Sequence, residues 1–429
     1  MSKSINSTCA KRSPWAWVPT LYFAQGLPYI AVMTLSVIMY KRLGVSNTDI
    51  ALYTGWLYLP WVIKPFWSPF VDIISTKRQW VIIMQWFVAI AFAGIAFALP
   101  VQFFFSLTLA VFWLVAFVSS THDIAADGYY MLALTEHEQS FYVGIRSTFY
   151  RIASVAGQGA LVVVAGCIEE STGDIPFAWG VVFFVLSAMF LFFAVYHSWA
   201  LPKVEIRNTK RNYTFNDVTK EFVRIFVAFF RKKQAGLAIL FMLLYRLPEA
   251  QLIKLINPFL LDASSIGGLG LSTSEVGIVY GTVGIIGLTA GGIIGGILAA
   301  KKGLHYWLKP MAWSMSLTCL TFVYLSWASE PSLLTINTCV FIEQFGYGFG
   351  FTAYMLYLIY FSEGEFSTAH YSICTGFMAL GMMLPGMAAG WIQETIGYRY
   401  FFIWTMICSI ATIGVTYLLK INPEFGKKH

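Results

Sequence analysis

Residues 119–151 read SSTHDIAADGYYMLALTEHEQSFYVGIRSTFYR, and this stretch ends one long apolar run and begins the next. Near its start, Asp123 and Asp127 are four residues apart, so a helix would place both carboxylates on one face. Moving an ionisable group to the centre of a bilayer costs at least about 2.5–3.5 kcal/mol on insertion scales. Because two carboxylates in one apolar segment are costly, this face is the first candidate for a functional site.

The composition around this stretch is that of a membrane protein. Of the 429 residues, 58% are hydrophobic and 11% are charged, whereas about 25% of an ordinary soluble domain is charged. A spanning helix needs roughly 20 mostly apolar residues. We therefore predict an all-α membrane protein with twelve transmembrane helices, which lie near 15–40, 48–72, 79–99, 103–134, 140–168, 177–198, 234–261, 274–300, 306–328, 332–361, 368–394 and 399–420.

The distribution of Lys and Arg predicts the orientation in the membrane. With both termini in the cytoplasm, the inside segments hold twenty of these residues and the outside loops hold Lys41, Arg42 and Arg399. Cytoplasmic loops carry the excess of basic residues, so we expect cytoplasmic termini. The net charge of +7 follows mostly from this asymmetry and requires no nucleic-acid partner. No small-residue cleavage pattern follows the first apolar run, which predicts an uncleaved first span.

A long hydrophilic interval at residues 200–233 divides the twelve segments six and six. It predicts an N-terminal six-helix bundle over 1–199, a cytoplasmic linker over 200–233 and a C-terminal six-helix bundle over 234–429. Within the linker, Phe215–Phe230 is expected to form an amphipathic helix on anionic lipid headgroups. Short echoes favour an internal duplication: Tyr130-Met131-Leu132 recurs as Tyr354-Met355-Leu356, and Leu27-Pro28 recurs as Leu247-Pro248.

Several features of other protein classes are missing from the sequence. The six cysteines are scattered without a CxxC pair, so neither a metal site nor a cofactor is indicated. No P-loop GxxxxGK[ST] occurs, which argues against ATP-driven transport. Gly291 and Gly295 are four residues apart, and this spacing predicts a face on which two helices approach closely.

Three motifs point to a known family. The first is LPWVIKPFWSPFVD at 59–72, the second is SSTHDIAAD at 119–127 with Tyr150-Arg151, and the third runs from SEVGIV at 274–279 to GIL at 296–298. Together they resemble the AmpG-like permeases of the major facilitator superfamily, in the group that also holds the acetyl-CoA transporters. The resemblance implies a twelve-helix, two-bundle fold with a central cavity and alternating access. It also implies proton-driven import of anhydromuropeptides across an inner membrane.

The resemblance assigns Lys64, Asp123, Asp127 and Arg151 to matching motif positions. After the second Asp, the pattern of these permeases continues with an aromatic residue, Lys, Thr and Asp, whereas residues 129–132 here are YYML. This departure leaves the solute open. An anhydromuropeptide or related amino-sugar fragment is the first expectation, and another saccharide, a peptide or acetyl-CoA is the second.

Nine charged side chains fall inside the predicted spans. Five are basic (Lys64, Arg146, Arg151, Arg246 and Lys254) and four are acidic (Asp123, Asp127, Glu249 and Glu343). Such residues default to roles in a transport pathway, although buried charges also pair only to hold helices together. A surplus of one cation favours a solute with one or two carboxylates over acetyl-CoA, whose phosphates would lack partners. Arg146 lies near the start of its span and is expected to reach the headgroups.

The candidates for proton coupling are Asp123, Asp127 and His122. Two carboxylates on one face repel when both are ionised, so one of them should hold a proton near neutrality. Lys64 or Arg151 would compete for that carboxylate once the proton leaves. A lone imidazole such as His122 serves either as a proton relay or only as a hydrogen-bond partner, and both interpretations stay open.

A polar stripe marks the seventh predicted span. On a helix with 100° per residue, Arg246, Glu249, Lys254 and Asn257 fall within a sector of about 140°. Arg246 and Glu249 could simply neutralise each other as an i, i+3 pair. Lys254 and Asn257 would still need partners or water. The predicted solute-binding set is Lys64, Arg151, Arg246, Glu249, Lys254, Asn257 and Tyr130.

The sequence therefore predicts a secondary active transporter rather than an enzyme. Its partners would be a small solute, protons and the lipid bilayer, and we expect a monomer. Two other classes remain open on the sequence alone. The spacing of His122 and Asp127 would suit a membrane-embedded acyltransferase, and a sensor with a transporter-like fold is the second alternative.

Overall fold

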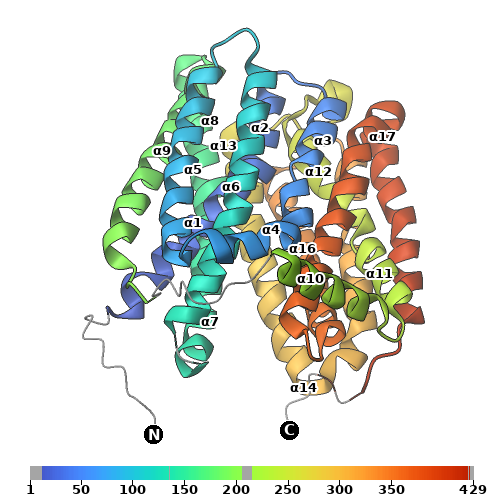
Figure 1. Cartoon of the computed structure of the whole chain (residues 1–429). Coiled ribbons are helices and arrows are strands. Elements are labelled where there is room, and N and C mark those ends of the chain that lie inside the picture. Colours follow the sequence, from blue (N-terminus) through green and yellow to red (C-terminus); the bar gives the residue numbers. More distant parts are fainter. Residues whose placement is uncertain (1–11, 135, 205–214, 424, 426–429) are drawn as a thin grey trace, which may run out of the picture.

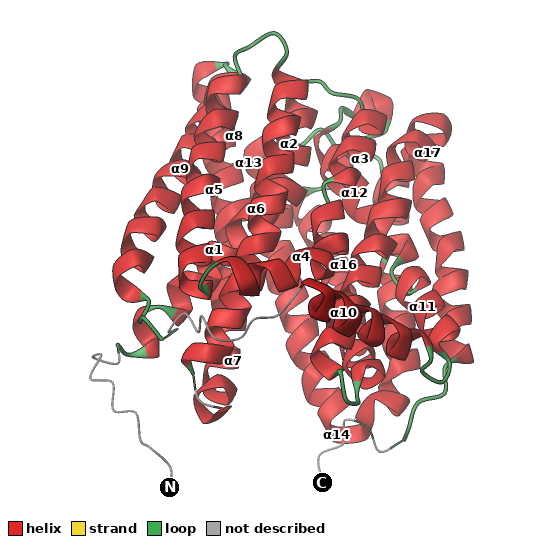
Figure 2. Ribbon diagram, in the orientation of Figure 1, coloured by secondary structure: helices red, strands yellow, loops and turns green. Residues whose placement is uncertain are grey.

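The computed structural model describes residues 12–134, 136–204, 215–423 and 425, and no strand occurs in these ranges. Figure 1 shows helices packed side by side, with the first and last described residues on the same side of the molecule, and Figure 2 shows the same helices joined by short loops. We call this side the terminal end and the opposite side the far end. The predicted all-α class is confirmed.

The N half, as we name helices α1 to α9, follows the first six predicted segments. α1 and α2 are joined by the π-helical turn η2, and α7 and α8 are joined by the π-helical turn η3. The bounds are α1 Val18–Ile30, η2 Ala31–Leu35, α2 Ser36–Arg42, α3 Asn47–Trp56, α4 Leu59–Ile74, α5 Lys77–Ala98, α6 Phe104–Ala133, α7 Glu136–Ser154, η3 Val155–Leu161, α8 Val162–Thr172 and α9 Ile175–Ala200.

The linker helix and the C half, helices α11 to α17, complete the chain. The bounds are α10 Phe215–Phe230, α11 Ala235–Leu244, α12 Leu247–Leu261, α13 Thr273–Ile278, η5 Val279–Gly284, α14 Ile285–Thr318, α15 Leu320–Trp327, α16 Leu333–Ser362 and α17 Ser367–Leu418. Glycines turn the chain inside the two longest helices. Gly303 in α14 and Gly397 in α17 have φ of 80° and 76°, a conformation that only glycine adopts without strain.

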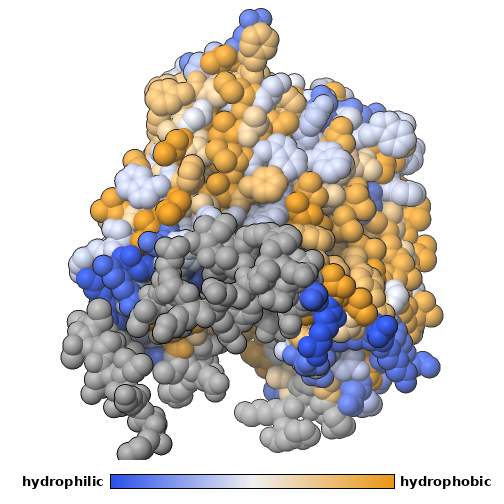
Figure 3. Space-filling view, in the orientation of Figure 1, coloured by the Kyte–Doolittle hydropathy of each residue, from blue (hydrophilic) through white to orange (hydrophobic). Residues whose placement is uncertain are grey.

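The helices agree with the spans that the sequence predicts. Within the described residues, eight helical stretches are long and apolar enough to cross a membrane. Two of these, over 273–327 and 369–418, contain the turns at Gly303 and Gly397. Together with α3–α4 and α16, this arrangement is consistent with twelve passes. The coloured surface in Figure 3 is mainly apolar, and hydrophilic side chains gather toward the terminal end.

Local signals explain where several helices begin. Thr76 and Gln79 form a capping box at the start of α5, and Ser272 and Glu275 form one at the start of α13. These side chains satisfy the backbone N–H groups that a helix leaves unpaired at its first turn. At the other end of a helix, Arg78 donates to the carbonyl oxygens of Ser198 and Leu201 and so satisfies backbone carbonyl groups where α9 ends.

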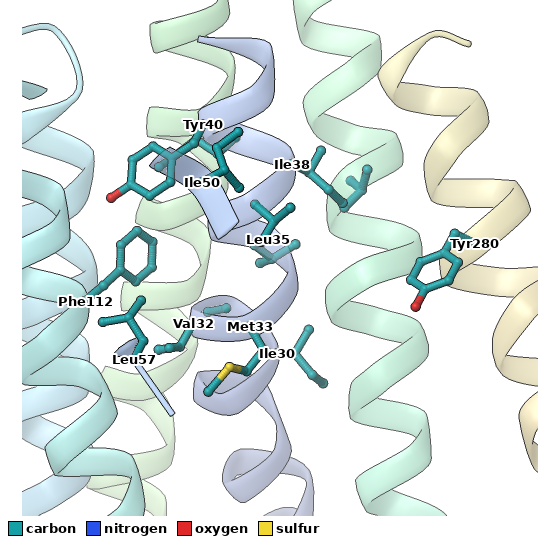
Figure 4. Close-up of a cluster of buried hydrophobic side chains, with 14 of the residues drawn as sticks. Ile30, Val32, Met33, Leu35, Ile38, Tyr40, Ile50, Leu57, Phe112 and Tyr280 are labelled. Carbon is teal, nitrogen blue, oxygen red and sulfur yellow. The ribbon is translucent and has the colours of Figure 1, made fainter. Parts of the chain in front are cut away.

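The main hydrophobic core is shared by the two halves. Figure 4 labels Tyr280 of the C half together with Leu35, Ile38 and Phe112 of the N half. Glycines allow such close packing between helices. A Cβ on Gly291 would lie 2.1 Å from the carbonyl oxygen of Phe345, so the predicted close approach at this glycine is confirmed, with α16 as the partner.

Polar contacts join the halves at the far end. Asn47 of α3 donates to Gln393 at 2.7 Å and to the hydroxyl of Tyr398 at 2.9 Å. Lys41 lies 2.7 Å from Asp262. We name this set the far-end latch, and it consists of Lys41, Asn47 and Thr48 from the N half with Asp262, Gln393, Glu394 and Tyr398 from the C half.

Candidate functional site

A cavity of about 550 Å³ lies between the two halves. Its wall comes from α1 and α7 of the N half and from α14 and α16 of the C half. Two arginines, four aromatic rings and an amide line it, namely Arg146, Arg151, Tyr22, Tyr150, Tyr347, Phe351 and Gln25. Pockets for small ligands commonly have this size and this mixture of aromatic surface and few polar groups.

Gly26 brings α7 against α1 and thereby positions the arginines of α7. A Cβ on Gly26 would lie 3.0 Å from the Cβ of Ala153 and 3.3 Å from the carbonyl oxygen of Tyr150. A side chain at this position would therefore push α7 back by a few tenths of an ångström. The face of α7 that carries Arg146 and Arg151 is therefore held at the cavity.

Asp127 lies at the centre of a cluster beside the cavity. Its Oδ1 lies 3.1 Å from a guanidinium nitrogen of Arg146 and accepts a hydrogen bond of 3.2 Å from the hydroxyl of Tyr22. The guanidinium carbon of Arg146 also stands 4.5 Å from the ring centroid of Tyr22 and 5.4 Å from that of Tyr130. The expectation that Arg146 reaches the headgroups is wrong, because this carboxylate and two rings hold it at the cavity.

Asp123 has different partners from Asp127. The indole N–H of Trp61 donates to its Oδ2 at 3.0 Å. Lys64 of α4 is near enough to act on Asp123 electrostatically, although the two described side chains make no direct ion pair. The structure thus places both aspartates on one side of α6 toward α1 and α4, and gives each its own donor.

Arg151 lines the cavity without a partner among the described residues. It makes no hydrogen bond or ion pair with the part of the chain that the structure describes. Gly292 of α14 faces it, since a Cβ at that position would lie 3.3 Å from a guanidinium nitrogen. An unpaired guanidinium offers a planar fork of N–H donors that matches a carboxylate.

Arg246 and Glu249 form the self-neutralising pair that the spacing allowed. Two guanidinium nitrogens of Arg246 donate to the two carboxylate oxygens of Glu249, at 2.6 and 3.0 Å. Arg246 also donates to the hydroxyl of Tyr347 at 2.8 Å and lies 4.8 Å from the ring centroid of Phe351. Both charged side chains are buried, so they reach the cavity only through these two rings.

The other half of the polar stripe lies elsewhere. Lys254 donates to Thr54 of the N half at 2.9 Å, and Asn257 is buried on the same helix. Neither residue lines the cavity. The structure therefore separates the stripe into a pair beside the cavity and a pair farther along α12, where Lys254 meets Thr54 of the N half; we name this surface between the halves the seam.

His122 points away from the two aspartates. Its Nε2 lies 3.1 Å from the amide nitrogen of Gln85, whose oxygen lies 3.0 Å from Nδ1 of His197. The other ring nitrogen of His197 lies 3.0 Å from the hydroxyl of Thr20. This buried chain joins α6, α5, α9 and α1, and the structure does not bring His122 together with Asp123 and Asp127.

Sequence reasoning missed Tyr347 and Phe351, although a signal for them existed. Tyr354 repeats Tyr130, so counting back by equal steps pairs Tyr347 with Asp123 and Phe351 with Asp127. The C half thus presents two aromatic rings where the N half presents two carboxylates. In the described ranges, no group of three His, Cys, Asp or Glu side chains is placed to hold a metal ion.

Comparison with known proteins agrees with this architecture. The chain is 24% identical over 418 residues to "Putative transporter AmpG 4" of Rickettsia conorii, covering 94% of this chain and 95% of that protein. It is 24% identical over 424 residues to "Anhydromuropeptide permease" of Escherichia coli K12, covering 95% and 80%.

A solved structure shares the fold over almost the whole length. The bacterial homolog of the human lysosomal transporter Spinster, crystallised in an inward-facing and unoccupied conformation, superposes with a TM-score of 0.71 at 16% identity. The match covers 96% of this chain and 97% of that chain. A family profile described as Major Facilitator Superfamily matches residues 20–369. The chain belongs to the Major Facilitator Superfamily.

Proposed function

We propose that this transporter imports anhydromuropeptides or related acidic amino-sugar fragments together with protons. The observation that carries the proposal is the guanidinium of Arg151, which lines the cavity without a partner in the described parts of the chain. A cation placed in a site of low dielectric requires an anion. The similarity to the permeases named above supports this choice of solute, and the acyltransferase alternative is dropped because the chain is a transporter.

The cavity suits both parts of such a solute. Arg151 would bind a carboxylate of the peptide portion. Tyr22, Tyr150 and Tyr347 would offer ring faces to the sugar portion. Gln25 also lines the cavity, and its buried amide oxygen has no hydrogen-bond partner in the described residues, so a change of side-chain rotamer would let it accept from a hydroxyl or amide of the sugar.

Proton coupling would act through the ion pair of Asp127 with Arg146. When Asp127 takes up a proton, its attraction for Arg146 falls, because the carboxyl is no longer charged. Arg146 then becomes the second cation of the cavity and can meet a second acid of the solute. Proton binding and solute binding would thus favour each other, as symport requires. Asp123, with Lys64 nearby, is the second candidate for the proton.

We place the protein in an inner membrane with both termini in the cytoplasm. The distribution of Lys and Arg supports this orientation. The far-end latch would then close the outside, and the cavity would serve the inward-facing state. Residues 1–199 and 234–429 would rock against each other around the cavity as two bodies joined by residues 200–233. One chain supplies the whole cavity wall, so a monomer suffices.

Uptake into proteoliposomes tests the proposal. Under an imposed proton gradient, the parent protein should accumulate an anhydromuropeptide, and Arg151→Gln should raise its KM by about tenfold or more, because a charge-assisted hydrogen bond is lost. The KM for an analogue with amidated carboxyls should change little. Arg151→Lys keeps the charge and serves as the control. Equal losses for both solutes would contradict the assignment, and tight binding of acetyl-CoA with none of a muropeptide would replace the solute.

A further inference from the structure

The seam between the halves holds a buried cation outside the cavity. Lys254 of α12 is 3% exposed, and its Nζ lies 2.9 Å from the hydroxyl oxygen of Thr54 on α3. The same nitrogen stands 5.2 Å from the ring centroid of Tyr58. Thr54 and Tyr58 belong to the N half, so this contact crosses the surface along which the halves meet.

The ammonium of Lys254 has too few acceptors for a buried charge. It carries three N–H donors, and Thr54 supplies one acceptor, because the hydroxyl of Thr54 itself donates to the carbonyl of Ile50. In the described ranges no carboxylate forms an ion pair with Lys254, so only the ring of Tyr58 adds to this single hydrogen bond. A buried charge with so few partners is costly, so an anion that reaches the ammonium would be bound favourably.

Close to Lys254, Asn257 has a buried hydrogen-bond acceptor that has no partner in the described chain. It lies one helical turn from Lys254, is 2% exposed, and its Oδ1 has no hydrogen-bond partner in the described chain. An orphaned buried acceptor needs a donor in the same way that the ammonium needs an anion. A ligand with both an anionic oxygen and an N–H donor would therefore satisfy Lys254 and Asn257 together.

We propose that Lys254 and Asn257 form a carboxylate subsite that opens to the outside when the seam parts. The ligand is the terminal carboxylate of a short peptide, with the adjacent amide N–H donating to Asn257. This inference rests on the proposed function, since the peptide belongs to the solute. Arg246 cannot take this role, because Glu249 already occupies two of its nitrogens.

Alternating access gives the subsite its place in the cycle. When the far-end latch opens, Thr54 moves away with the N half and Lys254 loses that acceptor. The carboxylate of an incoming solute then replaces Thr54. When the halves close again, Thr54 competes for the same ammonium, and the solute is released toward Arg151. The subsite would therefore act on binding from outside and leave binding to the inward-facing state nearly unchanged.

Two measurements on the full-length transporter test the subsite. Lys254→Gln in proteoliposomes should raise the KM for uptake of an acidic muropeptide by about tenfold or more. The KM for its amidated analogue should change less than about twofold, within the effect of an ordinary surface substitution. The Kd of the detergent-purified, inward-facing protein should stay near the parent value. Lys254→Arg should restore uptake, and Lys309→Gln, which removes an exposed charge of α14, is the matched control.

Two outcomes would assign Lys254 a packing or latch role instead of a carboxylate subsite, and two more separate failure of the subsite from failure of the proposed function. Equal rises in KM for both solutes would overturn the subsite and show that Lys254 only packs the seam. An unchanged KM for the acidic muropeptide, with faster labelling of a cysteine at Val45 from outside, would also overturn it and make Lys254 part of the latch. If the parent itself takes up neither solute, the proposed function fails; if uptake depends on solute charge but not on Lys254, only the subsite fails.

Discussion

At the scale of the residue, the pair of Asp127 with Arg146 carries a prediction about energy coupling. Asp127→Asn removes the carboxylate that we propose binds the proton, so Arg146 loses its ionic partner at every pH. We expect uptake under a proton gradient to stop at equilibration, while exchange of labelled for unlabelled solute continues. Both are measured in proteoliposomes, and Glu170→Gln, at an exposed acid of α8, should accumulate solute like the parent.

The same test includes Asp123→Asn, because either aspartate could hold the proton. Loss of accumulation in one variant identifies the coupling residue. If both Asn variants concentrate solute as well as the parent protein, proton coupling through α6 is wrong.

Single residues of the site could be predicted only where their spacing decides their neighbours. The i, i+4 spacing of Asp123 and Asp127 and the i, i+3 spacing of Arg246 and Glu249 fix contacts within one helix. The partner of Asp127 on another helix depends on how α7 packs on α1, which Gly26 controls. No pattern along the chain encodes that packing. The sequence alone therefore places Arg146, the partner of Asp127 on α7, at the lipid headgroups instead of at the cavity.

At the scale of the element, the linker helix shows what periodicity predicts and what it leaves out. The amphipathic pattern predicts a helix over Phe215–Phe230, and α10 has these bounds. Its packing requires the folded chain: Phe229 is fully buried against the C half, and Arg224 lies 2.9 Å from Glu365. The ring of Phe226 also lies 5.8 Å from that of Phe66 on α4, so α10 contacts both halves. Its predicted position on lipid headgroups stays a prediction.

The glycines of the seam carry a prediction at this scale. A Cβ on Gly281 would lie 1.9 Å from the carbonyl oxygen of Gln158 in the other half, which leaves no room for a side chain. Gly281→Ala should therefore hold the seam apart and favour the outward-open state. We expect a cysteine at Val45 to react several times faster with an impermeant thiol reagent, and uptake to fall, because closing the seam would force a buried clash.

Gly236→Ala is the matched control for this experiment. Gly236 lies in α11, and a Cβ there meets nothing within 4 Å. The substitution should leave labelling and uptake unchanged, since alanine also favours a helix over glycine by about 1 kcal/mol. Equal labelling of Val45→Cys in the Gly281→Ala and Gly236→Ala proteins would show that the seam does not need to close at Gly281.

At the scale of the whole molecule, the fold was predictable because the bilayer fixes the length and polarity of each pass. The way in which the two halves pack against each other was not predictable from the sequence. A transporter must populate at least two arrangements of one sequence, so neither the latch at Asp262 nor the contact of Lys254 with Thr54 follows from any pattern along the chain. Such contacts join residues about 200 or more positions apart, as for Thr54 and Lys254.

The orientation in the membrane gives the last prediction, and it tests the side on which the latch closes. Single cysteines are placed in a protein without native cysteines and probed in intact cells with an impermeant thiol reagent. Lys301→Cys should be protected, because it lies near the turn at Gly303 at the basic terminal end. A cysteine at Lys210, which lies outside the described residues, should also be protected. Ser171→Cys, exposed at the end of α8, should be labelled. The reverse pattern would place the far-end latch in the cytoplasm, and the closed latch would then describe an outward-facing transporter whose cavity loads Arg151 from outside.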